Sequence, residues 1–139
     1  MKTLKSILLG LALIIVTNVV KADDVAKLTK DHAVSTYVDA LAHGKIEGLT
    51  EVLDSNAKFS IMRGNKVISY GKNEMLNFYQ TTADTEQNCT VNSSTVENNG
   101  EVAIVKIDMH YNGFTRSNLV TVANTGDGWK ITNVHSVFK

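Results

Sequence analysis

The last third of the chain alternates between apolar and polar residues with the period of a β-strand. Over residues 101–111, every second side chain is apolar or aromatic. These side chains are Ala103, Val105, Ile107, Met109 and Tyr111. Asn-Gly pairs at 99–100 and 112–113 flank the run, and this pair fits the positive φ angles of a tight hairpin turn. The pattern predicts a strand over 101–111 whose apolar face lies in the core.

The first half of the chain instead has the period of a helix. Apolar positions recur at three- and four-residue spacing over 24–42 and form one face. This predicts a helix over the whole range, with Tyr37 on its inward face. Asp23 or Asp24 can cap the start of the helix, because a short carboxylate accepts the free N–H groups of the first turn. Gly44 can end it by adopting a positive φ.

Shorter patterns supply the remaining elements. They predict two further helices, over 45–53 and 72–82, and five further strands, over 57–62, 66–70, 89–97, 114–123 and 129–138. The resulting order is ααββαββββ. This order is typical of an α+β protein in which three helices pack on one face of a strongly curved antiparallel sheet. A sheet that bends around a long helix leaves a cavity at its open end.

The N-terminal segment has the three-part pattern of a secretory signal. Lys2 and Lys5 make a basic start, an apolar run follows, and Ala22 stands where a signal peptidase cuts. The apolar run is roughly 14 residues, shorter than the ~20 that a membrane span needs, which favours cleavage over an uncleaved anchor helix. We therefore expect residues 1–22 to be a signal peptide. Residues 23–139 would then be a single domain of an exported bacterial protein, periplasmic or secreted, with no stable membrane span.

Composition narrows the function classes further. The chain carries 14 basic and 14 acidic residues without a basic cluster, which argues against binding nucleic acid. Cys89 is the single cysteine, so no intrachain disulfide forms, and burial on a strand is favoured over a thiol available to a partner. The four histidines and this cysteine lack the spacing of a metal site. We expect no metal and no cofactor.

Three segments carry a resemblance to a known family. The run Thr36–Leu49 resembles the opening of nuclear transport factor 2-like proteins, in which a helix leads through a glycine step into a short second helix. The segments 119–122 and 128–134 resemble the closing strands of the same superfamily. The similarity covers the whole predicted domain and is greatest to the putative lumazine-binding subgroup, next to the SnoaL-like proteins. The resemblance implies a cystatin-like, nuclear transport factor 2-like cone.

The same resemblance suggests Tyr37 as a site residue. Its position before Gly44 matches the tyrosine of ketosteroid isomerases, whose phenol donates a hydrogen bond to a developing oxyanion. The isomerase base would fall at Ile61, which cannot accept a proton, and the second donor near Asn118, which cannot act as an acid. The favoured alternative is that Tyr37 packs its ring and bonds its hydroxyl to a neighbour.

His135 is the second candidate. It shares one face of the last predicted strand with Trp129 and Asn133, and this face points inward if Trp129 and Ile131 pack on the first helix. A histidine at this place often lines the pocket in SnoaL-like relatives. The alternative is a wall residue whose imidazole is hydrogen-bonded within the protein.

Three functional hypotheses remain open, because the superfamily includes isomerases, cyclases, dehydratases, transport factors and many non-catalytic binders. The preferred one is a non-catalytic binder of a small apolar or aromatic molecule. Its pocket would be lined by Tyr37, Phe59, Ile61, Tyr79, Met109, Asn118, Asn133 and His135. The second is an enzyme of the isomerase, cyclase or dehydratase type that uses Tyr37 and His135. The third is a protein-interaction module that uses its dimer surface or the polar loop 81–87.

Val102 and Ile104 suggest a partner. They lie on the outer face of the strand over 101–111, beside charged residues, and an exposed apolar patch often marks an interface. The resemblance implies dimers that pair through the outer faces of their sheets. We therefore expect a homodimer through this face.

Overall fold

The computed structural model describes residues 29–139, which form three helices and six strands in the predicted order. In chain order these are α2 (Lys30–His43), α3 (Leu49–Val52), β1 (Leu53–Arg63), β2 (Lys66–Gly71), α4 (Lys72–Thr81), β3 (Thr90–Asn98), β4 (Val102–Tyr111), β5 (Phe114–Thr125) and β6 (Gly128–Phe138). The predicted signal peptide (1–22) and its cleavage site lie outside the described residues. Among residues 29–139, no helix has the length and apolar character that a membrane crossing requires.

All six strands form one open sheet in the order β2-β1-β6-β5-β4-β3. Neighbouring strands are antiparallel, with one exception. β1 and β6 are parallel, and Phe59 pairs with Val134 between them. The sheet therefore differs in this one pair from the wholly antiparallel sheet that the sequence predicts.

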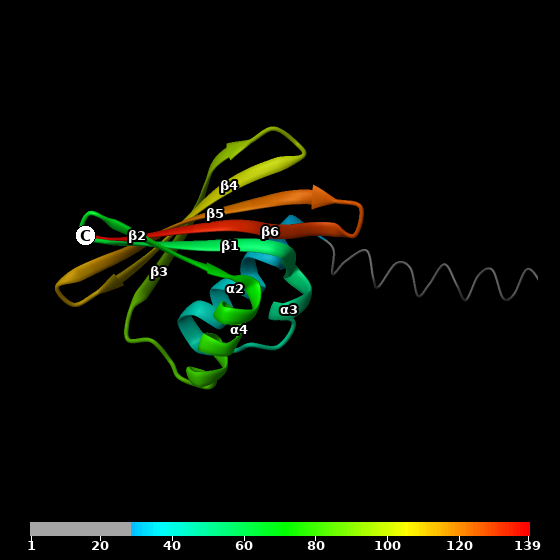
Figure 1. Ribbon diagram of the computed structural model, residues 1–139. Helices are drawn as coiled ribbons and strands as arrows, with labels where there is room; N and C mark the ends of the chain where they lie inside the picture. Colours follow the sequence, from blue (N-terminus) through cyan, green and yellow to red (C-terminus); the bar gives the residue numbers. More distant parts are fainter. Residues whose placement is uncertain (1–28) are drawn as a thin grey trace, which may run out of the picture.

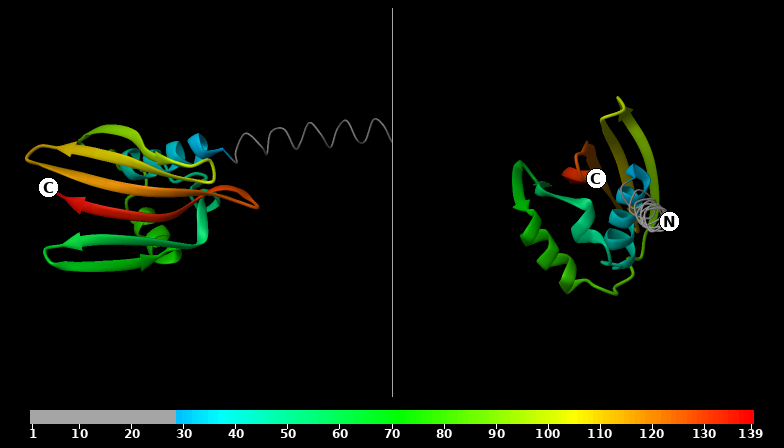
Figure 2. Two further views of the ribbon diagram at one scale, coloured as in Figure 1. Left: turned by 90° about the horizontal axis from the view of Figure 1, so that it is seen from above. Right: turned by 90° about the vertical axis from the view of Figure 1, so that its right-hand side faces the viewer.

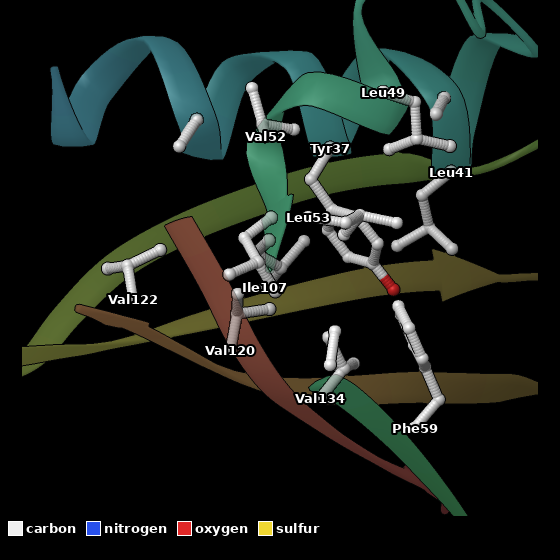
Figure 3. Packing of buried hydrophobic residues seen from close by; sticks show 14 of the residues in the cluster. Tyr37, Leu41, Leu49, Val52, Leu53, Phe59, Ile107, Val120, Val122 and Val134 are labelled. Carbon is white, nitrogen blue, oxygen red and sulfur yellow. The ribbon is translucent and has the colours of Figure 1, made fainter. Parts of the chain in front are cut away.

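The three helices lie on one face of the sheet, and the sheet curves around them (Figures 1 and 2). The predicted alternation along β4 separates its two faces: the inward side chains Ala103, Val105, Ile107 and Met109 are at most 3% exposed. Figure 3 shows the Tyr37 ring reaching from α2 toward the sheet, beside Phe59 of β1. The layered α+β architecture of the cystatin-like cone is thus confirmed.

The first helix begins later than predicted. Thr29 caps α2, because its side chain accepts a hydrogen bond from the His32 N–H at 3.2 Å. The predicted caps, Asp23 and Asp24, lie outside the described residues. The predicted end is confirmed, since Gly44 has φ 67°. A Cβ at Gly44 would also lie 2.6 Å from the Thr85 backbone nitrogen, so both conformation and space require glycine here.

The second helix is shorter than predicted. The sequence pattern predicts it over 45–53, whereas α3 covers only Leu49–Val52. Gly48 precedes α3 with φ 77°, a conformation that does not continue a helix, and β1 begins directly at Leu53. The apolar pattern nevertheless identified buried positions, since Leu49, Val52 and Leu53 are at most 3% exposed.

The last strand contains one extra residue. Thr121 and Val122 of β5 pair with Asn133 and Ile131 of β6, so Thr132 has no partner and forms a β-bulge. Because side chains alternate along a strand, one extra residue reverses the two faces beyond it. Ile131 faces the core before the bulge, and Val134 and Ser136 face it afterwards.

Candidate functional site

A pocket of about 470 Å³ opens between α4 and the inner face of the sheet. β1, β2, β5 and β6 supply one side and α4 the other. We call it the mouth pocket and define it by its lining residues, which are Ile61, Arg63, Tyr70, Glu74, Met75, Asn77, Phe78, Arg116 and Phe138. A smaller hollow of about 310 Å³ lies between α2 and strands β3 and β4, and no aromatic side chain lines it. A further hollow of about 620 Å³, beside residues 45–47 and 80–84, likewise has no aromatic lining. The mouth pocket is the candidate site because aromatic side chains line it.

The mouth pocket exposes aromatic surface. Phe78 of α4 is 53% exposed and Phe138 at the end of β6 is 49% exposed. Ile61, Tyr70 and Met75 add apolar wall between them. Concave, largely apolar surfaces of this size with a few polar groups are typical of small-molecule sites.

Polar contacts fix α4 over the pocket. Glu74 accepts a hydrogen bond from the backbone N–H of Gly71, at 3.3 Å, and so satisfies a free donor at the helix start. Lys72 donates to the carbonyl oxygens of Thr50 and Leu53, each at 2.9 Å, which ties this end of α4 to α3 and β1. These contacts hold the helix wall at a defined distance from the sheet.

Arg116 supplies a cation on the sheet side of the pocket. Its Nε donates to Asn118 Oδ1 at 3.1 Å, and its Nη2 donates to Ser136 Oγ at 3.5 Å. Its guanidinium carbon lies 5.7 Å from the centroid of the Phe138 ring, within cation–π range. Asn118 and Ser136 are at most 2% exposed and bond to each other at 2.6 Å. A buried, satisfied pair of neutral groups therefore positions the guanidinium.

The deeper end of the same space is closed. The hydroxyl oxygens of Tyr37 and Tyr79 lie 3.0 Å apart, and the two rings meet edge to face with centroids 6.3 Å apart. Phe59 packs beside them, with its centroid 6.4 Å from that of Tyr37. Burial raises the pKa of the Tyr37 phenol well above its usual value, and the Tyr79 phenol adds to the rise. Both hydroxyls are protonated at neutral pH, because burial raises the pKa of Tyr79 as well.

Most of the predicted pocket residues belong to the closed end. Ile61 alone among them lines the mouth pocket. The buried ones are Tyr37, Phe59, Tyr79, Met109 and Asn118, each at most 3% exposed. Tyr37 therefore follows the favoured alternative, with its ring packed and its hydroxyl bonded to a neighbour.

His135 and Asn133 lie on the other side of the sheet. Both side chains are exposed, whereas Val134 between them is 2% exposed. The prediction assumed unbroken alternation from Trp129, and the bulge at Thr132 reverses it. The inward direction expected for His135 is therefore wrong, and Tyr37 and His135 do not share a cavity.

The outer face of the sheet combines an apolar patch with a polar network. Val102 is 37% exposed, Leu119 is 42% exposed and Ile104 is half-buried. These three residues on β4 and β5 are the outer apolar patch.

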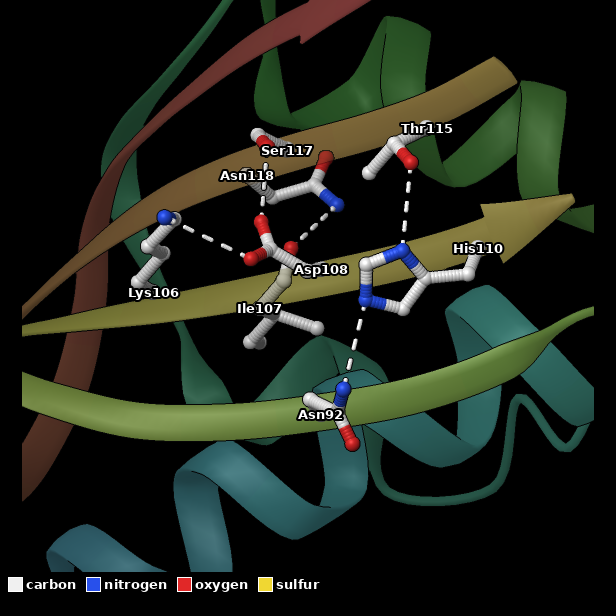
Figure 4. A network of polar contacts seen from close by, with 8 residues as sticks. All are labelled: Asn92, Lys106, Ile107, Asp108, His110, Thr115, Ser117 and Asn118. Carbon is white, nitrogen blue, oxygen red and sulfur yellow. Dashed lines mark hydrogen bonds and ion pairs between the residues drawn. The ribbon is translucent and has the colours of Figure 1, made fainter. Parts of the chain in front are cut away.

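The polar network lies on the same outer face, with side chains from β3, β4 and β5 (Figure 4). Asp108 accepts a hydrogen bond from Ser117 Oγ at 2.6 Å and lies 3.4 Å from the Lys106 ammonium. The Ser117 hydrogen bond holds the pKa of Asp108 below its usual value, although partial burial opposes this shift. His110 lies between Asn92 and Thr115, within hydrogen-bond distance of both.

The polar loop after α4 is bound to the end of α2. The Asp84 N–H donates to the Gly44 carbonyl at 2.9 Å, and the Gln87 N–H donates to the Ala42 carbonyl at 2.8 Å. His43 Nδ1 and Glu86 Oε1 lie 2.6 Å apart. These contacts fix the predicted interaction loop against the domain.

Cys89 and the side chains that could bind a metal are the remaining reactive groups. Cys89 is free and half-buried, and it packs against the hydrophobic core. In the part of the chain that the structure describes, no group of three or more His, Cys, Asp and Glu side chains could hold a metal ion.

Sequence reasoning missed the most informative residue of the pocket. Arg116 stands two positions before Asn118 on β5, and residues two apart share a face of a strand. Because Asn118 was expected to point inward, the same alternation could have placed Arg116 inside as well. Phe78 lies on the apolar side of α4 and Phe138 at the end of β6, and no local pattern marks either of them as pocket lining.

Comparison with known proteins gives a family and a set of structural neighbours. The model of the family described as "Putative lumazine-binding" matches residues 26–138. An NTF2-like protein from Silicibacter pomeroyi is 19% identical, with 86% of this chain and 97% of that chain covered and a TM-score of 0.62. A cystatin-like fold protein from Burkholderia xenovorans is 17% identical, with 84% and 92% covered and a TM-score of 0.60.

An activity is named in the description of a further neighbour. A structure described as a "putative ketosteroid isomerase", from Parabacteroides distasonis, is 14% identical, with 78% of this chain and 86% of that chain covered and a TM-score of 0.56. At these identities the likeness concerns the fold alone. No curated protein matches the chain.

Proposed function

This chain belongs to the family described as "Putative lumazine-binding", within the nuclear transport factor 2-like superfamily, and from this premise we propose that it is an exported, homodimeric protein that binds a small apolar or aromatic molecule in the mouth pocket. The observation that carries the proposal is the pocket itself. It has the volume of a small-molecule site, and Phe78 and Phe138 expose aromatic surface there that an occupant would cover.

A binder is favoured over the enzyme that the sequence suggested. That enzyme needs a hydrogen-bond donor and an acid–base group in one cavity. Tyr37 is fully buried and bonded to Tyr79, whereas His135 is exposed on the opposite side of the sheet. The isomerase-type mechanism with this pair therefore has no geometric support.

The binding proposal is tested on the purified protein. A native mass spectrum should show a retained small molecule, or a panel of aromatic compounds should raise the melting temperature. Phe78→Ala should reduce the shift, because it removes part of the pocket wall. Val67→Ala is the matched control, since Val67 is 55% exposed but does not line the pocket. No retained molecule and no shift across the panel would contradict the proposal.

The homodimer is proposed to form through the outer apolar patch. Its support is the exposure of Val102 and Leu119 beside half-buried Ile104, since apolar area of this kind is typically covered by a partner. Leu119→Lys should convert a dimer into a monomer in analytical ultracentrifugation, whereas Val96→Lys, on the edge strand, should leave the dimer intact. A monomeric wild type would refute this part of the proposal.

Export is proposed from the sequence of residues 1–22. Expression of the full chain in a bacterium, followed by cell fractionation and N-terminal sequencing, tests it. The expected product begins at Asp23 and lies outside the cytoplasm. A full-length product that stays in the cytoplasmic fraction would contradict export.

A further inference from the structure

Arg116 is a cation without an anionic partner in the mouth pocket. Among residues 29–139 the ion pairs are His43–Glu86 and Lys106–Asp108, so no carboxylate lies within ion-pair distance of Arg116. Its protein partners, Asn118, Ser136 and the Tyr79 hydroxyl, are neutral. A charge in a largely apolar pocket is costly unless an opposite charge or enough hydrogen bonds accompany it.

The other charged groups of the pocket do not supply that partner. Arg63 adds a second guanidinium, and Glu74 is the single carboxylate of the lining. Glu74 is bonded to the backbone of Gly71 at the start of α4. The pocket thus carries an excess of positive charge beside its aromatic wall.

The guanidinium keeps hydrogen-bonding capacity. Its bonds to Asn118 and Ser136 and its contact with the Tyr79 hydroxyl leave part of the five N–H donors of a guanidinium free. The Arg116 charge is also felt at the closed end. Burial raises the pKa of Tyr79, and the nearby guanidinium charge opposes this rise. A planar guanidinium with free donors matches a carboxylate, which it binds with two parallel hydrogen bonds.

We propose that the occupant of the mouth pocket is a small organic anion, whose carboxylate pairs with Arg116 and whose apolar or aromatic body packs on Phe138, Phe78 and Ile61. This inference rests on the proposed binding function and adds the chemical class of the ligand. Asn118 and Ser136 act as positioning residues, because they hold the guanidinium at the pocket wall without contacting the ligand.

The test compares acids with their uncharged amides. Benzoate, phenylacetate and naphthoate, and the amides of the same three acids, are titrated into the full protein by calorimetry. Wild type should bind the best carboxylate about 10- to 100-fold more tightly than its amide, as expected for hydrogen bonds to a charged group. Arg116→Gln should abolish this preference while it still binds the amide, which also shows that the variant is folded. Arg116→Lys should keep part of the preference, because it retains the charge without the planar fork.

A control variant tests whether a positive charge outside the pocket has the same effect. Lys66→Gln removes an exposed positive charge on β2, outside the pocket, and should keep the full preference. Equal affinity of wild type for acid and amide, or an unchanged preference in Arg116→Gln, would overturn the anion inference and leave the binding proposal standing. If wild type binds no member of either series, the inference and the binding proposal fail together.

Discussion

The two ends of the space between the helices and the sheet are packed differently, although the same strands line both. Phe59 on β1 and Asn118 on β5 are at most 2% exposed at the closed end. Two positions away on the same strands, Ile61 and Arg116 line an open pocket. The strands alone therefore do not decide where the space is filled.

The difference comes from the helical side chains that face each end. At the closed end Tyr37 of α2 meets Tyr79 of α4 and Phe59 of β1, and these three rings fill the space. At the mouth α4 presents Glu74 and Asn77 beside its apolar residues, and these shorter polar side chains leave the hollow open. The cavity therefore remains where polar residues of α4 face the sheet.

The largest effect is expected from removing the ring that fills the closed end. Tyr37→Ala should lower the free energy of unfolding by about 3–5 kcal/mol, as for large buried aromatic residues. Phe78→Ala at the mouth should cost less than about 1 kcal/mol, because that ring is half exposed. Urea denaturation of both variants measures the two losses. Equal losses would show that the two ends are packed alike.

A smaller effect is expected from removing one buried hydroxyl. Tyr37→Phe leaves the Tyr79 hydroxyl without its 3.0 Å partner and should cost about 1–3 kcal/mol. Tyr70→Phe is the control at the mouth, where the side chain is only partly buried, and should change stability by less than about 0.5 kcal/mol. The same urea titrations apply. A neutral Tyr37→Phe would mean that the hydroxyl pair adds nothing to the closed end.

Local patterns predicted the fold well where they were regular. The strict alternation of β4 identified its core face, and Gly44 marked the end of α2 correctly. The parallel pairing of β1 with β6 had no local signal, because it joins segments that are far apart in the chain. The helix predicted over 45–53 was longer than α3, because the apolar pattern continued into β1 at Leu53.

The candidate site was predicted less well, for two physical reasons. A single unpaired residue, Thr132, reversed the end of β6 and moved His135 to the outer face. For Tyr37 the sequence left two readings, a pocket-lining ring and the favoured packed ring, because whether an inward ring fills or lines a cavity depends on its neighbours, here Phe59 and Tyr79. Strand alternation could have placed Arg116 inside, because it stands two positions before Asn118. That it has no carboxylate partner can be seen only in three dimensions.

The contribution of the closed end to stability should depend on pH in the alkaline range. The pKa values of Tyr37 and Tyr79 are raised by burial, so the folded state keeps both phenols protonated above pH ~10, where unfolded tyrosines ionise. The stability that they contribute is complete below the unfolded pKa and is lost as pH rises toward the folded values. Urea midpoints measured across this range should fall, and fall less steeply in Tyr37→Phe. An identical slope in that variant would contradict the raised pKa of Tyr37.

The outer face holds a partly buried hydrogen-bonded pair, Ser117 and Asp108, and its effect should be the smallest. Ser117→Ala removes the hydrogen bond that lowers the pKa of Asp108, so this pKa should rise toward its usual value of about 3.9. The loss in stability at neutral pH should be about 0.5–1 kcal/mol. In wild type this contribution is present above the unfolded pKa and is lost as pH falls through the lower, folded pKa.

The carboxyl titration of Asp108 by NMR distinguishes this hydrogen bond from a general effect of the outer face. Thr115→Ala is the control, because Thr115 contacts His110 rather than Asp108, and it should leave the Asp108 titration unchanged. If Ser117→Ala leaves that titration unchanged too, then Lys106, 3.4 Å away, rather than Ser117 sets the pKa of Asp108. The partly exposed Lys106–Asp108 pair would then depend on charge, whereas the buried tyrosine pair depends on a hydrogen bond, and the contrast between the core and the outer face would be sharper still.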